Sequence, residues 1–449
     1  MKNINYIKIV TLAILFSMVV TSCNRDFPNP NNPTQEVVLG SKDGLFALSV
    51  GIGQYYSTTA LRQVIEAPGI TTRELGVTNT FLNINELANG GDVLPPESGG
   101  ITNPWVSLLR VKGMTESLLA NIDNVDLAAE TRSSLIAFAS FYKAMTLGHL
   151  LQMFEQVPIN NAADGQAPFS DRATVLTECI MLLERGRDAL GANPVSAEFI
   201  SKVLGTDIDL LNSINAFLSR YNLMAGNYIE SISSADAVLN STGQATSYFA
   251  YDANNVNPIW NRTVNSADLN PQTNFGLLGA FLPEAGDGRI AFYLGADAGF
   301  ANGDAGGQAL SEMLGFFSSS ISSIPVYLYG EMLLNKAEAY ARNTDLPNAV
   351  VQIDLVRMKT ADPYGVNANL AAWTGNATDL NEVLDEIYRN RGIEMFLTGM
   401  RLEDSRRFHP NLLTVPNPPN TTNERNRNYY PYPTIETDNN NAVPSQPVL

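Results

Sequence analysis

The chain has 449 residues, of which 45% are hydrophobic and 16% are charged, and its formal net charge at neutral pH is −17. This apolar content excludes a disordered chain, and an acidic sequence without a basic block argues against a nucleic-acid partner. Two histidines and two cysteines leave little room for Cys/His zinc sites, disulfide scaffolds or histidine-based catalysis.

The first 23 residues resemble a lipoprotein export signal. Lys2 and Lys8 precede an apolar run over 9–20, which is shorter than the about 20 residues of a membrane span. Two small residues then lead into Cys23, so we predict a signal peptide over 1–22 and lipidation of Cys23. An ordinary signal peptide with an incidental cysteine is the alternative.

The remaining chain is predicted to be a tethered body. Residues 23–34 are rich in Asn and Pro, which indicates a flexible tether, and residues 35–449 are expected to form a single domain. Cys179 lies in the apolar stretch 175–183, so we expect a buried structural thiol there.

Long helices and helical pairs dominate the rest of the pattern. Residues 135–154 are apolar on nearly every face, which predicts a helix covered on both sides. Residues 210–225 have the same character, break at Gly226, and resume over 228–239 as the second helix of a hairpin.

A clearer hairpin is predicted over residues 327–358. Ala337 and Ala349 are small, so the two helices can approach closely, and this spacing resembles the tetratricopeptide repeat. A further pair starts at Asp379, where Glu382 suggests a capping box, and turns at Gly399 into a last helix over 400–408.

Two segments lack a sustained hydrophobic period. Residues 66–104 and 241–325 are rich in Gly, Asn, Pro, Ser and Thr, and we interpret them as irregular excursions with few and short strands on the helical scaffold.

Three stretches in the second half of the chain form a recognisable set of motifs. They are LLNKAEAYAR at 333–342 with Val356-Arg357, RGIEMFLTGMRLEDSRR at 391–407, and Tyr430-Pro431-Tyr432-Pro433 with Glu436. In this order, they resemble the motifs of the SusD/RagB family of outer-membrane nutrient-binding lipoproteins. Cys23 stands where that family carries its lipid anchor. The chain departs from the family pattern at Thr398, where an acidic residue is common, at Gly392 and at Ser405.

The resemblance implies a mostly α fold of about four tetratricopeptide-like hairpins that support an irregular, loop-rich ligand-binding lobe with a few short strands. It also implies a cell-surface lipoprotein of the outer membrane, without enzymatic activity or cofactor. The implied partners are a SusC-like TonB-dependent transporter and an oligosaccharide or peptide ligand.

Aromatic residues next to short polar ones in the irregular segments are the candidate ligand-binding residues, because sugar rings stack on aromatic faces. They are Phe81 beside Asn83 and Asn85, Trp260 beside Asn261 and Arg262, and Phe292-Tyr293 after Arg289; Trp373 lies in a further loop. Each of these aromatic rings could instead pack under its own loop.

Two further clusters carry competing interpretations. Arg391, Glu394, Arg401, Asp404 and Arg407 are interpreted as a structural ion-pair network rather than a ligand site. Asp297, Asn302 and Asp304 offer oxygen ligands for calcium, although a plain flexible loop fits their spacing better.

Two other classes of function stay open. One is a repeat scaffold that binds peptide or protein through a concave helical face, and the other is a helical glycoside hydrolase, which would need two suitably spaced carboxylates.

Overall fold

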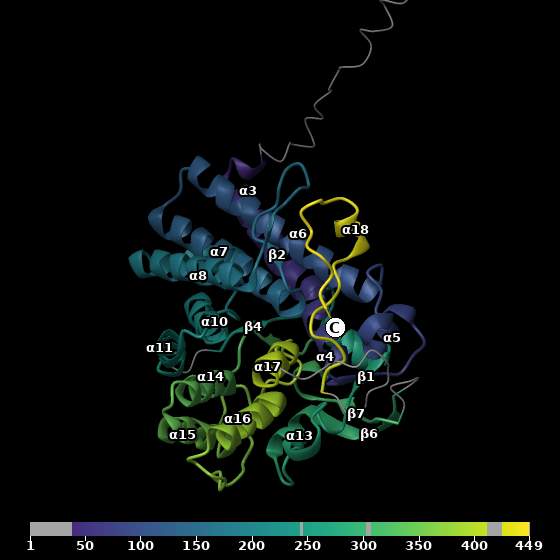
Figure 1. Cartoon of the computed structure of the whole chain (residues 1–449). Coiled ribbons are helices and arrows are strands. Elements are labelled where there is room, and N and C mark those ends of the chain that lie inside the picture. Colours follow the sequence, from purple (N-terminus) through teal and green to yellow (C-terminus); the bar gives the residue numbers. More distant parts are fainter. Residues whose placement is uncertain (1–37, 243–245, 302–306, 411–423, 449) are drawn as a thin grey trace, which may run out of the picture.

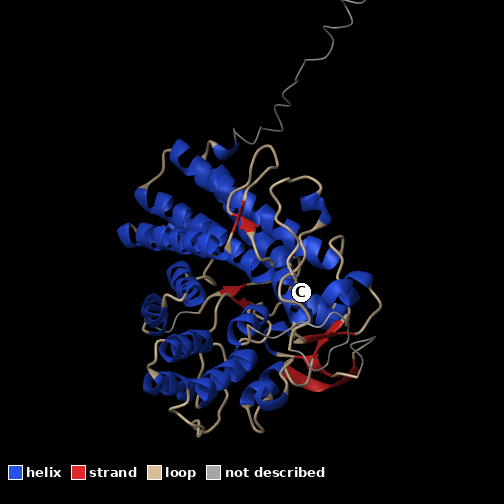
Figure 2. Ribbon diagram, viewed as in Figure 1, coloured by secondary structure: helices blue, strands red, loops and turns tan. Residues whose placement is uncertain are grey.

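The computed structural model describes residues 38–242, 246–301, 307–410 and 424–448, most of which are helical (Figures 1 and 2). The predicted mostly α fold is therefore confirmed, and the strands pair only two by two. Within the described ranges, no helix combines the length and apolarity that a bilayer crossing requires. Cys23 and the predicted tether lie outside the described residues.

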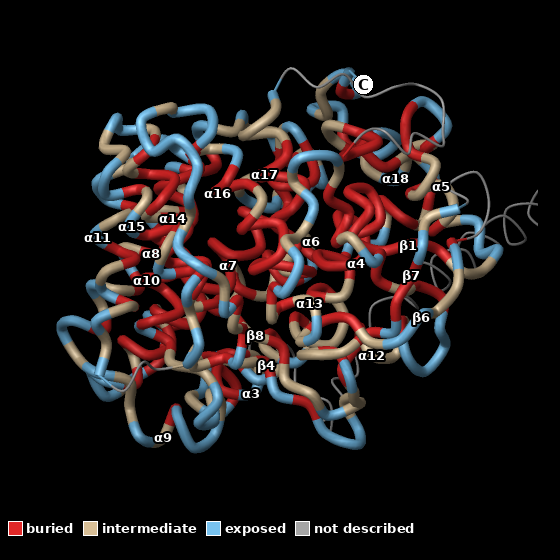
Figure 3. Tube along the Cα trace, turned by 90° about the horizontal axis from the view of Figure 1, so that it is seen from below, coloured by how far each residue is buried: buried red, intermediate tan, exposed pale blue. Residues whose placement is uncertain are grey.

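Long helices pack side by side in the N-terminal half (Figure 1). They are α3 (Lys42–Tyr55), the π-helical turn η1 (Tyr56–Ala60), α4 (Leu61–Thr71), α6 (Gly99–Asn121), α7 (Ala129–Met153) and α8 (Arg172–Ala192). α7 contains the predicted apolar helix, and it is buried on almost all faces because it packs between α6 and α8. Buried residues run through the centre of the molecule along α4, α6 and α7 (Figure 3).

Helical pairs follow in the second half. They are α10 (Leu210–Ala225) with α11 (Tyr228–Leu239), α14 (Tyr329–Arg342) with α15 (Leu346–Arg357), and α16 (Leu380–Glu394) with α17 (Arg401–Phe408). Gly226 ends α10 with a φ of 83°, and Ala337 and Ala349 are fully buried in the α14–α15 pair. The predicted breaks and close approach are therefore confirmed.

The capping box at α16 forms only in half. The Asp379 side chain accepts from the amides of Asn381 and Glu382, at 2.8 and 3.3 Å. The Glu382 carboxylate, however, accepts from the amide of Asn376 instead of returning to Asp379. Asp379 is thus a simple N-cap.

The segment 241–325 is irregular, as predicted, and carries most of the strands. Its elements are β4 (Tyr248–Phe249), α12 (Pro258–Trp260), the π-helical turn η5 (Asn261–Asn265), β5 (Leu269–Pro271), η6 (Gly279–Phe281), α13 (Gly288–Tyr293), β6 (Leu294–Phe300), β7 (Ala309–Met313), η8 (Gly315–Phe317) and β8 (Ile324–Pro325). β1 (Leu75–Val77) pairs antiparallel with β5, with Gly76 opposite Asn270, and β6 pairs with β7. A bridge between Gln272 and Leu310 joins these two pairs, and β4 pairs with β8.

The prediction of an irregular segment over 66–104 is wrong in part. Besides β1, it holds the end of α4, all of α5 (Leu82–Asn89), η2 (Gly91–Val93) and the start of α6. Proline and glycine are compatible with these helices because Pro68 stands in the last turn of α4, and Ser98 caps the Gly-Gly start of α6 by accepting from the Gly100 amide.

The remaining elements are short. They are η3 (Ile122–Asn124), β2 (Val157–Pro158) paired with β3 (Phe169–Ser170), α9 (Ala197–Phe199), the π-helical turn η4 (Ile200–Leu204) and α18 (Thr434–Thr437).

The charged C-terminal motif forms a buried ion-pair network, as predicted. Arg391 Nε lies 2.9 Å from Asp404 Oδ2, and Arg407 Nε lies 2.7 Å from Glu338 Oε1. Burial alone would raise the pKa of Glu338, but the guanidinium groups of Arg407 and Arg391 lower it to about 2. The network joins α14, α16 and α17.

Arg401 is the exception in this motif. α16 ends at Glu394 and α17 begins at Arg401, so these two residues do not share a continuous helix. The Arg401 guanidinium lies 4.7 Å from the centroid of the Tyr388 ring, and its nitrogens have no hydrogen-bond partner among the described residues. It is held by a cation–π contact within an otherwise paired cluster.

Candidate ligand-binding site

The connection between β1 and α5 places Phe81 at the surface. The backbone amide of Thr78 donates to the carbonyl of Asp268 at 3.0 Å, which ties this connection to the loop before β5. The side chain of Asn79 then accepts from the Phe81 amide at 2.9 Å. Phe81 is thereby fixed at the start of α5 with 54% of its surface exposed.

Phe81 borders a pocket of about 130 Å³ built from four segments. The lining residues are Arg62, Gln63, Glu66 and Ala67 from α4; Phe81, Asn83, Ile84 and Leu87 around α5; Gly99, Gly100 and Asn103 from α6; and Arg262 from η5. We call this the Phe81 pocket. A Cβ atom on Gly99 would lie 3.5 Å from Cβ of Asn83, so the glycine leaves room between the two asparagines Asn83 and Asn103.

The charges at the Phe81 pocket compensate one another. Arg262 Nη2 lies 3.3 Å from Glu66 Oε1, and Arg262 also pairs with Asp268. Arg62 Nε lies 3.5 Å from Glu66 Oε2. The pocket therefore offers many hydrogen-bond donors and acceptors without a net charge, beside an exposed aromatic ring. An uncharged polyhydroxyl ligand suits this combination.

Part of the predicted binding set comes together here. Phe81 and Asn83 line the same pocket, and so does Arg262, which follows Trp260 closely in the chain. Trp260 is half-buried at the end of α12, where the side chain of Asn257 accepts from its amide, and it does not line the pocket.

Two predicted binding residues are corrected by their burial. Arg289 is 1% exposed; its guanidinium lies 2.7 Å from Asp287 Oδ2 and 3.2 Å from Glu394 Oε2. Tyr293 is fully buried, and its hydroxyl donates to the carbonyl of Glu394 at 3.3 Å. Both side chains hold α13 against α16 and leave no surface for a ligand.

The sequence interpretation missed the α4 side of the pocket. Arg62 and Glu66 are four residues apart and share one face of α4, a spacing that is visible in the sequence. They were missed because the chain after residue 66 was interpreted as irregular, so nothing indicated that α4 would lie beside α5.

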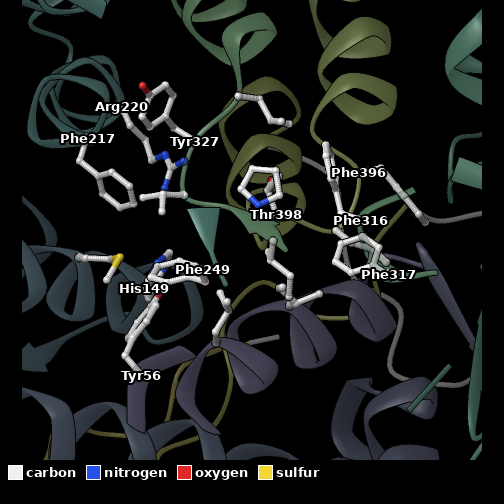
Figure 4. A pocket seen from close by; sticks show the side chains of 18 residues that line it. Tyr56, His149, Phe217, Arg220, Phe249, Phe316, Phe317, Tyr327, Phe396 and Thr398 are labelled. Atoms are coloured by element: carbon white, nitrogen blue, oxygen red, sulfur yellow. The ribbon is translucent and has the colours of Figure 1, made fainter. Parts of the chain in front are cut away.

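An interior cavity is lined mainly by apolar side chains, which include the aromatic rings of Tyr56, Phe217, Phe249 and Phe396 (Figure 4). Its volume of about 30 Å³ holds about two water molecules, which is too little for a sugar ring.

The interior cavity also holds two basic side chains. Arg220 Nε lies 2.7 Å from Glu331 Oε1, and burial lowers the pKa of His149 to about 3, so that this histidine is neutral. His149 is thus part of the buried interior of the fold.

The predicted calcium ligands are only partly described. Asp297 lies in β6, whereas Asn302 and Asp304 lie outside the described residues. Within the described ranges, no group of three His, Cys, Asp or Glu side chains is arranged to hold a metal ion. Calcium binding stays a prediction.

Comparison with known proteins gives a consistent result. A family model described as the SusD family matches residues 318–447. A SusD superfamily protein from Bacteroides thetaiotaomicron has a TM-score of 0.69 at 14% identity, over 91% of this chain and 100% of its own. NanU from Bacteroides fragilis gives 0.68 at 13% identity, over 93% and 99%. A putative sugar-binding protein from Bacteroides vulgatus gives 0.64 at 16% identity, over 90% and 98%.

No curated protein matches the sequence. The resemblance found in the C-terminal motifs is nevertheless confirmed by the family match and by the shared fold. Residues 318–447 match the SusD family model, and the described chain as a whole shares its fold with solved structures of SusD-superfamily proteins.

Proposed function

We propose that this protein binds a glycan at the cell surface and delivers it to a SusC-like TonB-dependent transporter of the outer membrane, to which Cys23 tethers it through a lipid. The observation that carries the binding role is the Phe81 pocket, where an exposed aromatic ring borders a polar, charge-compensated cavity. A similar structure described as a putative sugar-binding protein supports the ligand class.

The size of the pocket sets the scale of the contact. A cavity of about 130 Å³ accepts one sugar ring or part of one, so a longer glycan would lie across the surface with one unit anchored at Phe81. The proposed binding residues in the pocket are Phe81, Asn83, Asn103 and Arg62, and Arg262 lines the pocket while paired with Glu66. Trp260, on the neighbouring α12, is the proposed contact for a further unit of the glycan outside the pocket.

The peptide-binding scaffold is the weaker alternative. It requires an open concave face between helical pairs, but α10 packs against α8, α11 and α14, and nearly all of its residues are buried. No observation on the described residues favours a groove there.

Substitution of Phe81 tests the binding site. We expect Phe81→Ala to weaken binding at least tenfold, about 1.4 kcal/mol, because the stacking surface is removed. Affinity electrophoresis against a panel of polysaccharides, followed by calorimetry with the oligosaccharide that binds, would measure this.

Phe300 supplies the matched control. It is also an exposed phenylalanine, at 66%, but it does not line the pocket. Phe300→Ala should bind like the unmodified protein, and equal losses in the two variants would contradict a specific site at Phe81.

The uptake role is tested separately by purification from the native membrane in mild detergent. A TonB-dependent barrel at near equal amount is expected to co-purify, and Cys23→Ser should release the protein from the membrane. Recovery of the acylated protein alone would contradict the transporter partnership.

A further inference from the structure

Another pocket, separate from the Phe81 pocket, is lined by α3 and η1, whereas the Phe81 pocket is lined by α4, which follows them in the same run of helix. This other pocket has a volume of about 220 Å³. Its lining comes from α3 and η1 (Ser49, Val50, Gly53, Gln54, Ser57), α7 (Phe138, Tyr142), the end of η4 and the following turn (Val203, Leu204, Asp207, Ile208), and β4 with its neighbour (Tyr248, Phe249, Ala250). We call it the Tyr142 pocket. It shares no lining residue with the Phe81 pocket.

The chain is unusual on two walls of the Tyr142 pocket. η1 and η4 are both π-helical turns, and insertions of this kind often mark functional sites. In η1, the carbonyl of Ser57 is satisfied by the hydroxyl of Tyr251 at 3.0 Å, a long-range contact that fixes the widened turn. The pocket walls are therefore held in place rather than left loose.

The pocket wall carries a hydroxyl that has no hydrogen-bond partner within the described ranges and is open to the pocket. Tyr142 is 2% exposed, and within the described ranges its Oη makes no hydrogen bond. A Cβ atom on Gly53 would lie 3.5 Å from this oxygen, so the glycine keeps the hydroxyl open to the pocket. The hydroxyl is therefore available inside the pocket to donate to, or accept from, a polar group of a ligand.

The rim adds acceptors, and the walls add aromatic surface. Asp207 is exposed and offers its carboxylate oxygens. The amide nitrogen of Gln54 donates to the side-chain oxygen of Asn255 at 2.8 Å, which leaves the amide oxygen of Gln54 available as an acceptor. Tyr248 is half-buried and Phe249 and Phe138 are buried at the pocket. Acceptors over aromatic faces match the hydroxyl donors and the C–H face of a sugar ring.

Size and charge narrow the ligand further. A dry cavity of about 150 Å³ accommodates a six-membered ring, so 220 Å³ has room for one ring with its hydroxyl groups but not for a chain. No lysine, arginine or histidine lines the pocket, and Asp207 is its charged residue, so an anionic ligand would be repelled.

From this arrangement we propose that the Tyr142 pocket is a second binding site, which takes a single neutral hexose unit. The ligand class rests on the proposed glycan-binding function, whereas the pocket itself does not involve Phe81. Gln54 of one pocket and Arg62 of the other are eight residues apart along the helices, or about 12 Å, so we expect each site to bind its ligand without the other.

The test uses saturation-transfer NMR on the full chain, in a detergent without a sugar headgroup. The probes are the methyl glycosides of glucose, galactose and mannose, with glucuronate as the anionic comparison. All measurements are made in the Phe81→Ala background, which removes the first site. At least one neutral probe should still bind, more tightly than glucuronate.

Two substitutions address the pocket directly. Tyr142→Phe removes only the unpaired hydroxyl, so binding should weaken about threefold to tenfold while the melting temperature does not fall. Gly53→Ala covers the same hydroxyl with a methyl group and should also weaken binding. Its matched control is Gly51→Ala on the same helix, where the new methyl group would meet only the end of Met114, at 3.5 Å.

Both alanine variants should be at least as stable as the background, since alanine favours a helix over glycine. Loss of all binding in Phe81→Ala would overturn the second site and leave the proposed function intact. A neutral probe that binds regardless of Phe81 but depends on Gly53 and Tyr142 would support the second site even if the Phe81 pocket fails. Equal binding in Gly53→Ala, Tyr142→Phe and Gly51→Ala, or tighter binding of glucuronate, would overturn it.

Discussion

At the scale of single residues, the C-terminal motif concentrates buried charge. Arg401 is the member of this motif whose nitrogens have no hydrogen-bond partner among the described residues. Thr398 stands near it where the family pattern commonly has an acidic residue, and the Thr398 hydroxyl donates to the Met395 carbonyl at 2.8 Å instead of meeting a cation. The neighbouring carboxylate is Glu74, which accepts from the amide of Leu397 at 3.0 Å. Burial raises the pKa of Glu74 to about 7, although the Leu397 amide and the Arg401 charge oppose the shift.

Glu74 should therefore make stability depend on pH near neutrality. Its pKa is higher in the folded than in the unfolded chain, so its contribution is fully present below about pH 4.5 and is lost as pH rises through about 7. Glu74→Gln keeps an acceptor for Leu397 but does not ionise, so it should be more stable than the unmodified protein at pH 8, by up to about 3 kcal/mol, and not at pH 4.5.

Chemical denaturation at pH 4.5, 6, 7 and 8 would measure this difference. Glu97→Gln, at an exposed position, serves as the control and should show no trend with pH. A stability difference between Glu74→Gln and the unmodified protein that stays constant over this range would contradict the argument.

At the scale of elements, sequence patterns predicted helices well where their burial was uniform. The apolar run of α7 and the small residues Ala337 and Ala349 report packing directly, because a helix enclosed by others must be apolar and a close helix pair must be small at the contact. The Phe81 pocket was only half predicted. Phe81 and Asn83 stood out as aromatic and polar neighbours, but a pocket across α4, α5, α6 and η5 depends on tertiary packing that local pattern does not encode.

Arg289 illustrates the opposite error. An arginine beside aromatic residues looks like a binding surface in sequence, but Asp287 and Glu394 pair with it in the core. The partner Glu394 is 105 residues away along the chain, so no local signal could have identified it.

Two glycines at helix boundaries differ in how crowded they are, so comparing them separates the cost of an unfavourable backbone conformation from the cost of a steric clash. Gly226 and Gly399 have φ values of 83° and 80°, in the left-handed region that other residues rarely adopt. A Cβ atom on Gly226 would meet nothing within 4 Å, whereas one on Gly399 would lie 2.6 Å from the carbonyl oxygen of Val64. The carbonyl of Val64 receives no helical hydrogen bond from Pro68, four residues later in α4, because proline has no amide hydrogen.

We therefore expect Gly226→Ala to cost about 1 kcal/mol of unfolding free energy, and Gly399→Ala clearly more, about 3 kcal/mol. Urea unfolding of the two variants would measure the difference. Equal losses would mean that the Val64 contact relaxes without cost and that only the backbone conformation matters.

At the scale of the whole molecule, the apolar core is divided into a large cluster and a smaller one. The smaller cluster joins α14, α15 and α16 through residues such as Leu334, Ala349 and Ile387, with Trp373 packed against it. Together with α17, this part is joined to the preceding helices by buried and partly buried ion pairs, including Arg220 of α10 with Glu331 and Arg172 of α8 with Glu403. Buried pairs fix geometry, but removing the charge of one partner leaves the other uncompensated.

Acid should for this reason loosen the α14–α17 region before the large core. Burial raises the pKa of Glu338 and Glu403, but Arg407 acting on Glu338 and Arg172 acting on Glu403 more than offset this, so that both pKa values fall to about 2. A depressed pKa contributes stability that is present above about pH 4.5 and is lost as pH falls through about 2. Each group then contributes up to roughly 3 kcal/mol, and its loss leaves buried guanidinium groups without partners.

The three tryptophans allow the two parts to be followed separately. Trp373 packs against the small cluster, and Trp105 is fully buried in the large one, where its indole nitrogen donates to Glu436 at 3.0 Å. In a Trp260→Phe background, adding Trp105→Phe or Trp373→Phe leaves one reporter at a time.

During an acid titration between pH 5 and 2, the emission of Trp373 should change at a higher pH than that of Trp105. In Glu338→Gln, the emission of Trp373 should change at a pH nearer to 7 than in the unmodified protein, because the arginines that pair with Glu338 have already lost its charge. Coincident transitions of the two reporters in every variant would show instead that the helical pairs and the large core unfold as one cooperative unit, in which the ion pairs stabilise the whole molecule rather than this interface.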